Sequence, residues 1–252
     1  MAEKKRPTIT NAAGYEEAKA AAQQGIAAPT GNATGLRIGA IVLWVLAVAC
    51  EIVAILVIFG KINITFLPTM WTIIILLVLD LAFVIIGAQL WKKANHIKPA
   101  SEKNKTLFWI WNNMGVIVAV FAFLPLIILM LSNKNLDKKT KVVCVVAAVI
   151  ALLIGGAASI DYNPVSQEQM EAAEQALGAT DVFWTPFGRV YHTHVDPEAD
   201  DYCPYLNQSD SLTRGTVDQA IAAGRTRLCS WCARHDAIEG VATDDVDATL
   251  GD

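Results

Sequence analysis

The sequence predicts an all-α membrane protein, a bundle of four transmembrane helices, followed by a small α+β domain at the C-terminus. Three observations predict this class. The 252 residues are 54% hydrophobic and 17% charged, with a mean hydropathy of +0.41, which is too apolar for an ordinary water-soluble domain. The apolar residues gather into four blocks, each about as long as a bilayer-spanning helix. The charge is divided, with a net +8 over residues 1–160 and −12 over residues 161–252.

Residues 1–36 form a polar leader rich in Ala, Gly, Thr and Gln. A short helix is predicted from Tyr15 to Gln24, because Gly25 is a typical helix end. The rest of this segment lacks a periodic apolar pattern, and we expect a flexible N-terminal tail.

The transmembrane domain is predicted over residues 37–160. Each of its apolar blocks is near the ~20 residues that cross ~30 Å of hydrocarbon as a helix. The four predicted helices are residues 38–59, 66–91, 107–131 and 142–160. Trp71, Trp91, Trp109 and Trp111 lie near block ends, where an indole ring favours the membrane interface.

Lys and Arg residues predict the orientation of these helices, because cationic loops resist translocation. Four helices place both termini on one side. With the termini inside, ten Lys and Arg residues of the leader and the second loop are cytoplasmic and five are outside. The sequence therefore predicts a multi-pass protein of the cell membrane with cytoplasmic N- and C-termini, although a Lys cluster in the third loop then lies outside.

Two acidic residues, Glu51 and Asp80, fall in the middle of predicted helices. A carboxylate at this depth is costly and usually faces protein, water or a partner. Helix lengths allow the two to sit at similar depth, where they share a proton or bond to an amide. Amide candidates are Gln89, Asn112 and Asn113. A proton or cation relay is one interpretation, and hydrogen bonding between helices is the simpler one.

Residues 161–180 are predicted as a linker helix, with a capping box at Ser166 and Gln169 and a stop at Gly178. Residues 181–236 then form a small domain. Residues 237–252 are acidic and are expected to be disordered.

Three of the five cysteines lie in this small domain. Cys229-Ser-Trp-Cys232 has the spacing at which two thiolates bind one Zn²⁺, and Cys203 with a histidine would complete a tetrahedral site. His192 and His194 are both candidates. Such a zinc ion has a structural role, because a domain of this size cannot build a sufficient core. A disulfide between Cys229 and Cys232 is the alternative if the domain lies outside the cell.

Residues 188–232 resemble a family of small bacterial zinc modules that occur in secreted nucleases and are related to Ada-type metal-binding domains. The shared features are Tyr-His at 191–192, Cys-Pro-x-Leu at 203–206, Ala-x-x-x-Gly at 220–224 and Cys-x-x-Cys at 229–232. The resemblance implies His192, Cys203, Cys229 and Cys232 as ligands. The gap between His192 and Cys203 is unusually long, which leaves His194 as an alternative ligand and His235 as a weaker third candidate.

The Ada-type likeness also suggests a cysteine that accepts a methyl group from DNA, but that chemistry requires a fourth zinc-bound cysteine and a basic surface. The acidic C-terminal part repels phosphates, so no nucleic-acid partner is expected. We see no phosphate loop, catalytic triad or zinc-hydrolase helix, and no catalytic residue is predicted.

The sequence favours a membrane-anchored interaction or regulatory protein. Trp184, Tyr205 and Trp231 are candidates for the surface that meets a protein partner, and a second copy of the chain is another candidate partner besides the lipid bilayer. The alternative is a small proton- or cation-linked transporter or channel subunit that uses Glu51 and Asp80. A metal-responsive sensor is a third class, which requires a metal that binds reversibly.

Overall fold

The computed structural model describes residues 6–24, 31–62, 66–134, 136–236 and 238. The chain divides into two compact units. The first, called the helical unit below, comprises Ala33–Ala94 and Lys105–Tyr162. The second, called the module, combines Met1–Asn32, Asn95–Asn104 and Asn163–Asp252. The module is therefore built from three separate stretches of the chain.

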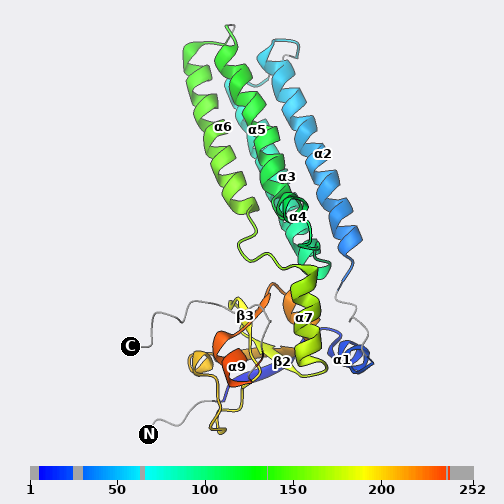
Figure 1. Cartoon of the computed structure of the whole chain (residues 1–252). Coiled ribbons are helices and arrows are strands. Elements are labelled where there is room, and N and C mark those ends of the chain that lie inside the picture. The colour runs from blue at the N-terminus through cyan, green and yellow to red at the C-terminus, as the bar shows by residue number, and fades with distance from the viewer. Residues whose placement is uncertain (1–5, 25–30, 63–65, 135, 237, 239–252) are drawn as a thin grey trace. The chain divides into compact units, whose positions relative to one another are not determined.

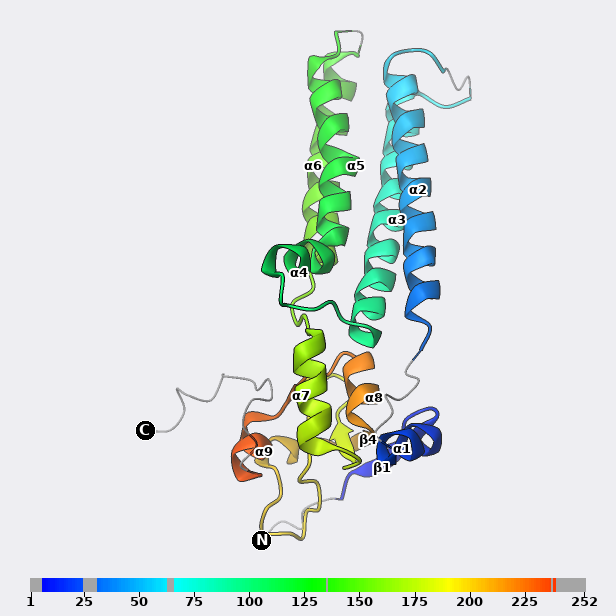
Figure 2. The ribbon, with the colours of Figure 1, turned by 45° about the vertical axis from the view of Figure 1, so that its right-hand side comes forward.

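Four long helices form the helical unit and run side by side (Figures 1 and 2). They are α2 (Ala33–Ile58), α3 (Thr69–Ile97), α5 (Met114–Ser132) and α6 (Lys138–Ser159). Within the described residues, these four are long and apolar enough to cross a membrane, with window hydropathies from 2.6 to 3.0. The prediction of four apolar helices is confirmed.

The third apolar block is not the single helix predicted over residues 107–131. It forms α4 (Lys105–Asn112) and α5, which are separated at Asn113 (φ −102°, ψ 15°). The side-chain amides of Asn112 and Asn113 donate to the carbonyls of Phe108 and Trp109, at 3.1 and 2.9 Å. Asparagine side chains that bond to the backbone in this way compete with helix continuation.

The helices also extend beyond the predicted apolar blocks, so that three basic residues, Arg37, Lys92 and Lys93, fall within α2 and α3. The Arg37 guanidinium lies over the rings of Trp91 and Trp111, at 5.9 and 5.2 Å from the ring centroids. Lys92 donates to the carbonyl of Ala158 at 2.9 Å. Both cations are thus placed against indole rings or a helix end.

The helices pack through faces on which buried residues recur every seven positions. On α2 the buried sets are Ala33, Ala40, Ala47 and Ala54, and Trp44, Glu51 and Ile58. On α3 they are Ile73, Asp80, Gly87 and Ala94, and Leu77, Val84 and Trp91. A seven-residue repeat keeps one face turned toward neighbouring helices, and small side chains allow close approach. Glu51 and Asp80 therefore belong to the packed faces.

The opposite faces of these helices are covered by exposed large apolar side chains, among them Val45, Val78, Phe121 and Leu153, which are 60–71% exposed. An apolar surface of this extent is unfavourable in water and suits hydrocarbon. Gly155 and Ser159, two small residues of α6, lie on its buried face. Their role is therefore packing inside the helical unit.

The module contains two small sheets. Strand β4 (Ser211–Gly215) is central in the first and pairs in parallel with β1 (Thr8–Asn11) and antiparallel with β2 (Val182–Trp184). The second sheet is a parallel pair of β3 (Val190–Tyr191) and β5 (Arg227–Leu228). A bridge between Phe183 and His192 joins the two sheets.

Helices surround these sheets: α1 (Tyr15–Gln23), α7 (Gln167–Leu177), α8 (Val217–Ala222), α9 (Ser230–His235) and the 3₁₀ turn η1 (Pro204–Leu206). α7 begins with the predicted capping box, in which Gln169 N–H donates to Ser166 Oγ at 3.1 Å and Ser166 N–H donates to Gln169 Oε1 at 3.0 Å. α8 carries a second capping box at Thr216 and Gln219. Residues of α7, α8 and the strands share one apolar core with the three cysteines.

The N-terminal segment is more ordered than a flexible tail. α1 confirms the predicted helix, but the structure adds strand β1, which no local pattern indicated. The Asp181 carboxylate accepts hydrogen bonds from Tyr15 Oη at 2.7 Å, from Lys19 Nζ at 2.9 Å and from Arg214 Nε at 2.8 Å. These contacts tie α1 to β4 and to the residue before β2.

The stretch Asn95–Asn104, which comprises the end of α3 and the loop before α4, is the third part of the module. Gln167 N–H donates to the carbonyl of Ala100 at 3.1 Å, and Glu102 N–H donates to the Glu168 carboxylate at 2.9 Å. Ser101 Oγ also donates to Glu168. Glu168 therefore holds this loop at the N-terminal turn of α7.

Candidate metal centre

The residues of the candidate metal centre follow the ends of the parallel pair β3 and β5. Tyr191 pairs with Leu228, so the next residue on each strand, His192 and Cys229, emerge at the same edge. Cys229 N–H donates to the carbonyl of Tyr191 at 2.9 Å, which fixes this neighbourhood. Cys229 is also the N-cap of α9, and Cys232 lies one turn later on that helix.

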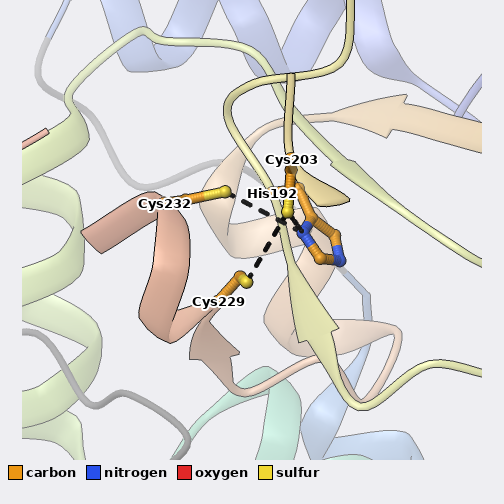
Figure 3. Close-up of side chains that lie close together, drawn as sticks. All are labelled: His192, Cys203, Cys229 and Cys232. Atoms are coloured by element: carbon orange, nitrogen blue, oxygen red, sulfur yellow. Dashed lines mark hydrogen bonds between the residues drawn. The ribbon is translucent and has the colours of Figure 1, made fainter. Parts of the chain in front are cut away.

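Cys203 comes from a different segment and precedes η1. Its N–H donates to the carbonyl of His194 at 3.1 Å. His192 is held by the bridge to Phe183, through backbone hydrogen bonds of 2.8 and 2.7 Å in the two directions. Backbone hydrogen bonds thus position His192, Cys203 and Cys229, and α9 positions Cys232. All four side chains point toward a common centre (Figure 3).

The four ligand atoms lie at distances that suit a tetrahedral metal site. Cys203 Sγ is 3.3 Å from His192 Nδ1 and 3.8 Å from Cys229 Sγ, and Cys232 Sγ is 3.9 Å from His192 Nδ1. Thiolate and imidazole ligands around one tetrahedral ion stand about 3.5–3.8 Å apart. All four atoms lie within 4.8 Å of one another. The group can therefore hold one metal ion.

This cluster, which we call the buried site, is closed to solvent. His192 is 4% exposed, Cys229 is 3% exposed, and Cys203 and Cys232 are fully buried. All five cysteines of the chain are free thiols. Four protein ligands in a buried cluster leave no open coordination position, which is the arrangement of a structural metal site rather than a catalytic one.

Close contact among these four side chains shifts the pKa values of three of them. Hydrogen bonds from Cys203 and Cys229 lower the pKa of the Cys232 thiol, and hydrogen bonding to Cys229 and Cys232 raises the pKa of the Cys203 thiol. Burial disfavours the imidazolium of His192, but hydrogen bonds and charge from Cys229 and Cys232 raise its pKa to about 9. A metal ion must displace these protons, so we expect binding to weaken as the pH falls.

His194, the alternative ligand considered from the sequence, is not in the buried site. The chain leaves the sheet after His192, and the His194 ring instead lies with Asp201 and Asp236. His235, the third candidate, lies beside His194 and also outside the buried site. The structure therefore brings His192 together with the three cysteines, and it separates the other two histidines from them.

Glu51 and Asp80, the two acidic residues of the predicted apolar blocks, occupy the packed faces of α2 and α3. Glu51 is 8% exposed and Asp80 is 1% exposed. Both carboxyl oxygens of Asp80 are buried without a hydrogen-bond partner among the described residues. Of the amide candidates, Gln89 donates to the carbonyl of Ala158, Asn112 to that of Phe108 and Asn113 to that of Trp109.

The predicted partner surface requires one correction. Trp184 is 5% exposed and belongs to the core of the module, because it lies on the inner face of β2. Tyr205 is exposed, and Trp231 stacks on His235 with ring centroids 5.0 Å apart. Phe187, which sequence reasoning did not single out, is 99% exposed. The turn that carries it gave no periodic signal from which its exposure could be read.

No family model, no curated protein and no solved structure matches this chain.

Proposed function

We propose that this chain is an integral membrane protein whose module is folded around a structural zinc ion and acts as a membrane-anchored interaction or regulatory domain. The observation that carries the proposal is the closed cluster of His192, Cys203, Cys229 and Cys232, in a module whose segments flank the apolar helices.

The ligand set supports zinc. Three thiolates and one imidazole in tetrahedral positions form a common structural zinc set, and soft thiolate ligands disfavour Mg²⁺, Ca²⁺ and Mn²⁺. The likeness of residues 188–232 to small bacterial zinc modules points to the same ion. Iron in a sulfur-rich tetrahedral site is the competing occupant, and metal analysis separates the two.

The way in which the module is assembled supports a regulatory or adaptor role. Its three segments lie before α2, between α3 and α4, and after α6. If the four helices span a membrane, all three segments lie on one side of it. Binding of the metal then stabilises a domain to which every helix is joined at one end, so a partner that engages the module is coupled to the helices.

In this arrangement Lys98, Lys103 and Lys105 lie on the same side of the membrane as the N-terminal segment. An excess of cationic residues on that side supports cytoplasmic termini. The Lys cluster of the third loop lies at the other ends of the helices. There, Lys141 Nζ donates to the carbonyls of Leu131 and Asn133. This lysine binds the C-terminal carbonyls of α5, so it has a packing role that is independent of orientation.

A test of the interaction role places a photo-crosslinking residue at Phe187 or Tyr205 of the full chain in the membrane of expressing cells. We expect a discrete crosslinked protein that disappears in Cys203→Ser and persists in the double variant Glu51→Gln and Asp80→Asn. The matched site for crosslinker background is Phe66, which is 82% exposed and lies outside the module. Crosslinks that are identical at Phe66 and Phe187 would contradict the proposal.

Transport is a second candidate function because Asp80 is buried and neither of its carboxyl oxygens has a hydrogen-bond partner among the described residues. A buried carboxyl group without a partner is costly and is often retained for function. The purified chain in lipid vesicles under a proton or K⁺ gradient separates the two roles. Flux that exceeds that of empty vesicles, and is lost in the double variant Glu51→Gln and Asp80→Asn, would replace the interaction role by transport.

A further inference from the structure

A second group of metal-ligand side chains lies outside the buried site. His194, Asp201 and His235 each offer one ligand atom, and these atoms lie within 4.8 Å of one another. The group draws on three segments: the stretch after β3, the turn before Cys203, and the last residue of α9. Residues this far apart in sequence converge only in the folded module.

Carboxylates face both ring nitrogens of His194, so this ring can bind a metal through Nδ1 when Nε2 keeps its proton and donates to Asp236. Its Nδ1 is 2.7 Å from Asp201 Oδ2, and its Nε2 is 2.5 Å from Asp236 Oδ1. Asp236 is itself held by Thr193 Oγ1, which donates to its other carboxylate oxygen at 2.8 Å. A metal-bound histidine typically donates its remaining ring N–H to a carboxylate, which fixes the tautomer and leaves the other nitrogen for the metal.

His235 is the third side chain of this ligand group. Its Nε2 lies 4.0 Å from Asp201 Oδ2. Its ring meets the His194 ring edge-on, with centroids 4.6 Å apart, and stacks on Trp231 at 5.0 Å. The two imidazoles and the carboxylate thus surround one point, and the tryptophan restrains the more exposed of the two rings.

This group differs from the buried site in access and in ligand type. The side chains of Asp201 and His235 are 43% and 45% exposed, and that of His194 is 15% exposed. Three protein ligands on an open surface leave coordination positions for water. Two histidines and one carboxylate, without a thiolate, suit divalent first-row transition metals.

We infer that His194, Asp201 and His235 form a second, solvent-accessible site for an exchangeable divalent transition-metal ion, with Asp236 as the positioning residue for His194. We call this group of three ligands the open site. It would share α9 with the buried site, because Cys232 and His235 both lie on that helix. Binding at the open site would therefore stabilise the helix that supplies two ligands of the buried site.

The test uses the full chain in detergent or nanodiscs, loaded with Zn²⁺ or Co²⁺ and freed of unbound ions. We expect about two ions per chain, of which a brief chelator treatment removes one. With Co²⁺, the buried ion gives a thiolate-to-metal charge-transfer band, and the open site adds only weak bands because it has no sulfur ligand.

Two variants, Asp201→Asn and His235→Gln, should each lose the chelatable ion and keep the charge-transfer band. Their matched controls are Asp200→Asn, an exposed neighbour with the same charge change, and His96→Gln, a histidine outside both groups. The inference is overturned if the wild type binds one ion, or if either site variant keeps the second ion. It is also overturned if Asp200→Asn lowers binding as much as Asp201→Asn, since that would indicate adsorption to an acidic surface.

Discussion

The ligand cluster of the module and Asp80 of the helical unit are buried polar groups with different surroundings. In the module, four ligand side chains converge within 4.8 Å and can be satisfied together by one ion. In the helical unit, Asp80 is 1% exposed and neither of its carboxyl oxygens has a hydrogen-bond partner among the described residues. The module is a small domain with short strands, and it gains its stability from a shared centre. The helices gain theirs from close packing of small and apolar faces.

This comparison predicts that metal loss acts on one unit alone. Cys203→Ser should remove the ion and unfold the module, because a structural zinc ion contributes about 10 kcal/mol or more to the folding of such domains. Hydrogen exchange on the full chain should show lost protection in β2–β5 and α7–α9, and unchanged protection in the apolar helices. The control is Cys50→Ser, which alters a cysteine of α2 outside the cluster. Equal loss of protection in both units would show that they fold as one.

A second prediction perturbs the helical unit instead of the module, by adding a methyl group where its helices pack. A Cβ at Gly115 would lie 2.6 Å from the Cβ of Ala88 and 3.1 Å from that of Ser159. Gly115→Ala should therefore destabilise the helical unit by about 1–3 kcal/mol, as overpacking usually does. Gly156→Ala is the matched control, because a Cβ there meets nothing within 4 Å. Thermal unfolding in detergent measures the effect, and metal content should stay the same in both variants.

Within the module, acid should also loosen the N-terminal segment, separately from its effect on metal binding. Burial opposes the charge of Asp181, but hydrogen bonds from Lys19, Tyr15 and Arg214 lower its pKa overall. A lowered pKa means that the carboxylate stabilises the fold above its unfolded pKa of about 4, and that this contribution is lost as the pH falls through the lower folded value. Asp181→Asn should cost about 1 kcal/mol at pH 7 and much less near pH 2.

Proteolysis or hydrogen exchange of α1 and β1 across this pH range measures the Asp181 effect. Asp200→Asn, an exposed residue, is the control and should change nothing. If Asp181→Asn loosened α1 equally at both pH values, the ion contacts would not be the cause.

The smallest effect on stability is expected at Phe187. Its side chain is 99% exposed, so Phe187→Ala should change the free energy of unfolding by less than about 0.5 kcal/mol. If the module is an interaction domain, the same change should still weaken crosslinking to a partner from a photo-crosslinking residue at Tyr205. The buried Trp184→Ala gives the opposite pattern, a loss of module stability. Unchanged crosslinking from Tyr205 in Phe187→Ala would show that the Phe187 side chain is not part of the partner surface.

Local sequence patterns were sufficient for the features that depend on neighbours along the chain. Long apolar runs determine where helices form in the helical unit, because each run alone satisfies its backbone hydrogen bonds and presents apolar side chains outward. The Ser166 capping box and the Cys229–Cys232 spacing are equally local, and both are confirmed as geometry. The break at Asn113 was missed because the apolar pattern continues across it.

Contacts between distant segments decided the rest. β1 pairs with β4 across about 200 residues, and nothing in residues 8–11 indicates that partner. The choice of His192 over His194 depends on the register of β3 and β5 and on the bridge to Phe183. The sequence by itself determined the apolar helices and three thiols as candidate metal ligands. Only the tertiary structure decided which histidine joins them and which joins Asp201, because the chain leaves the sheet after His192 and His194 no longer shares a strand face with it.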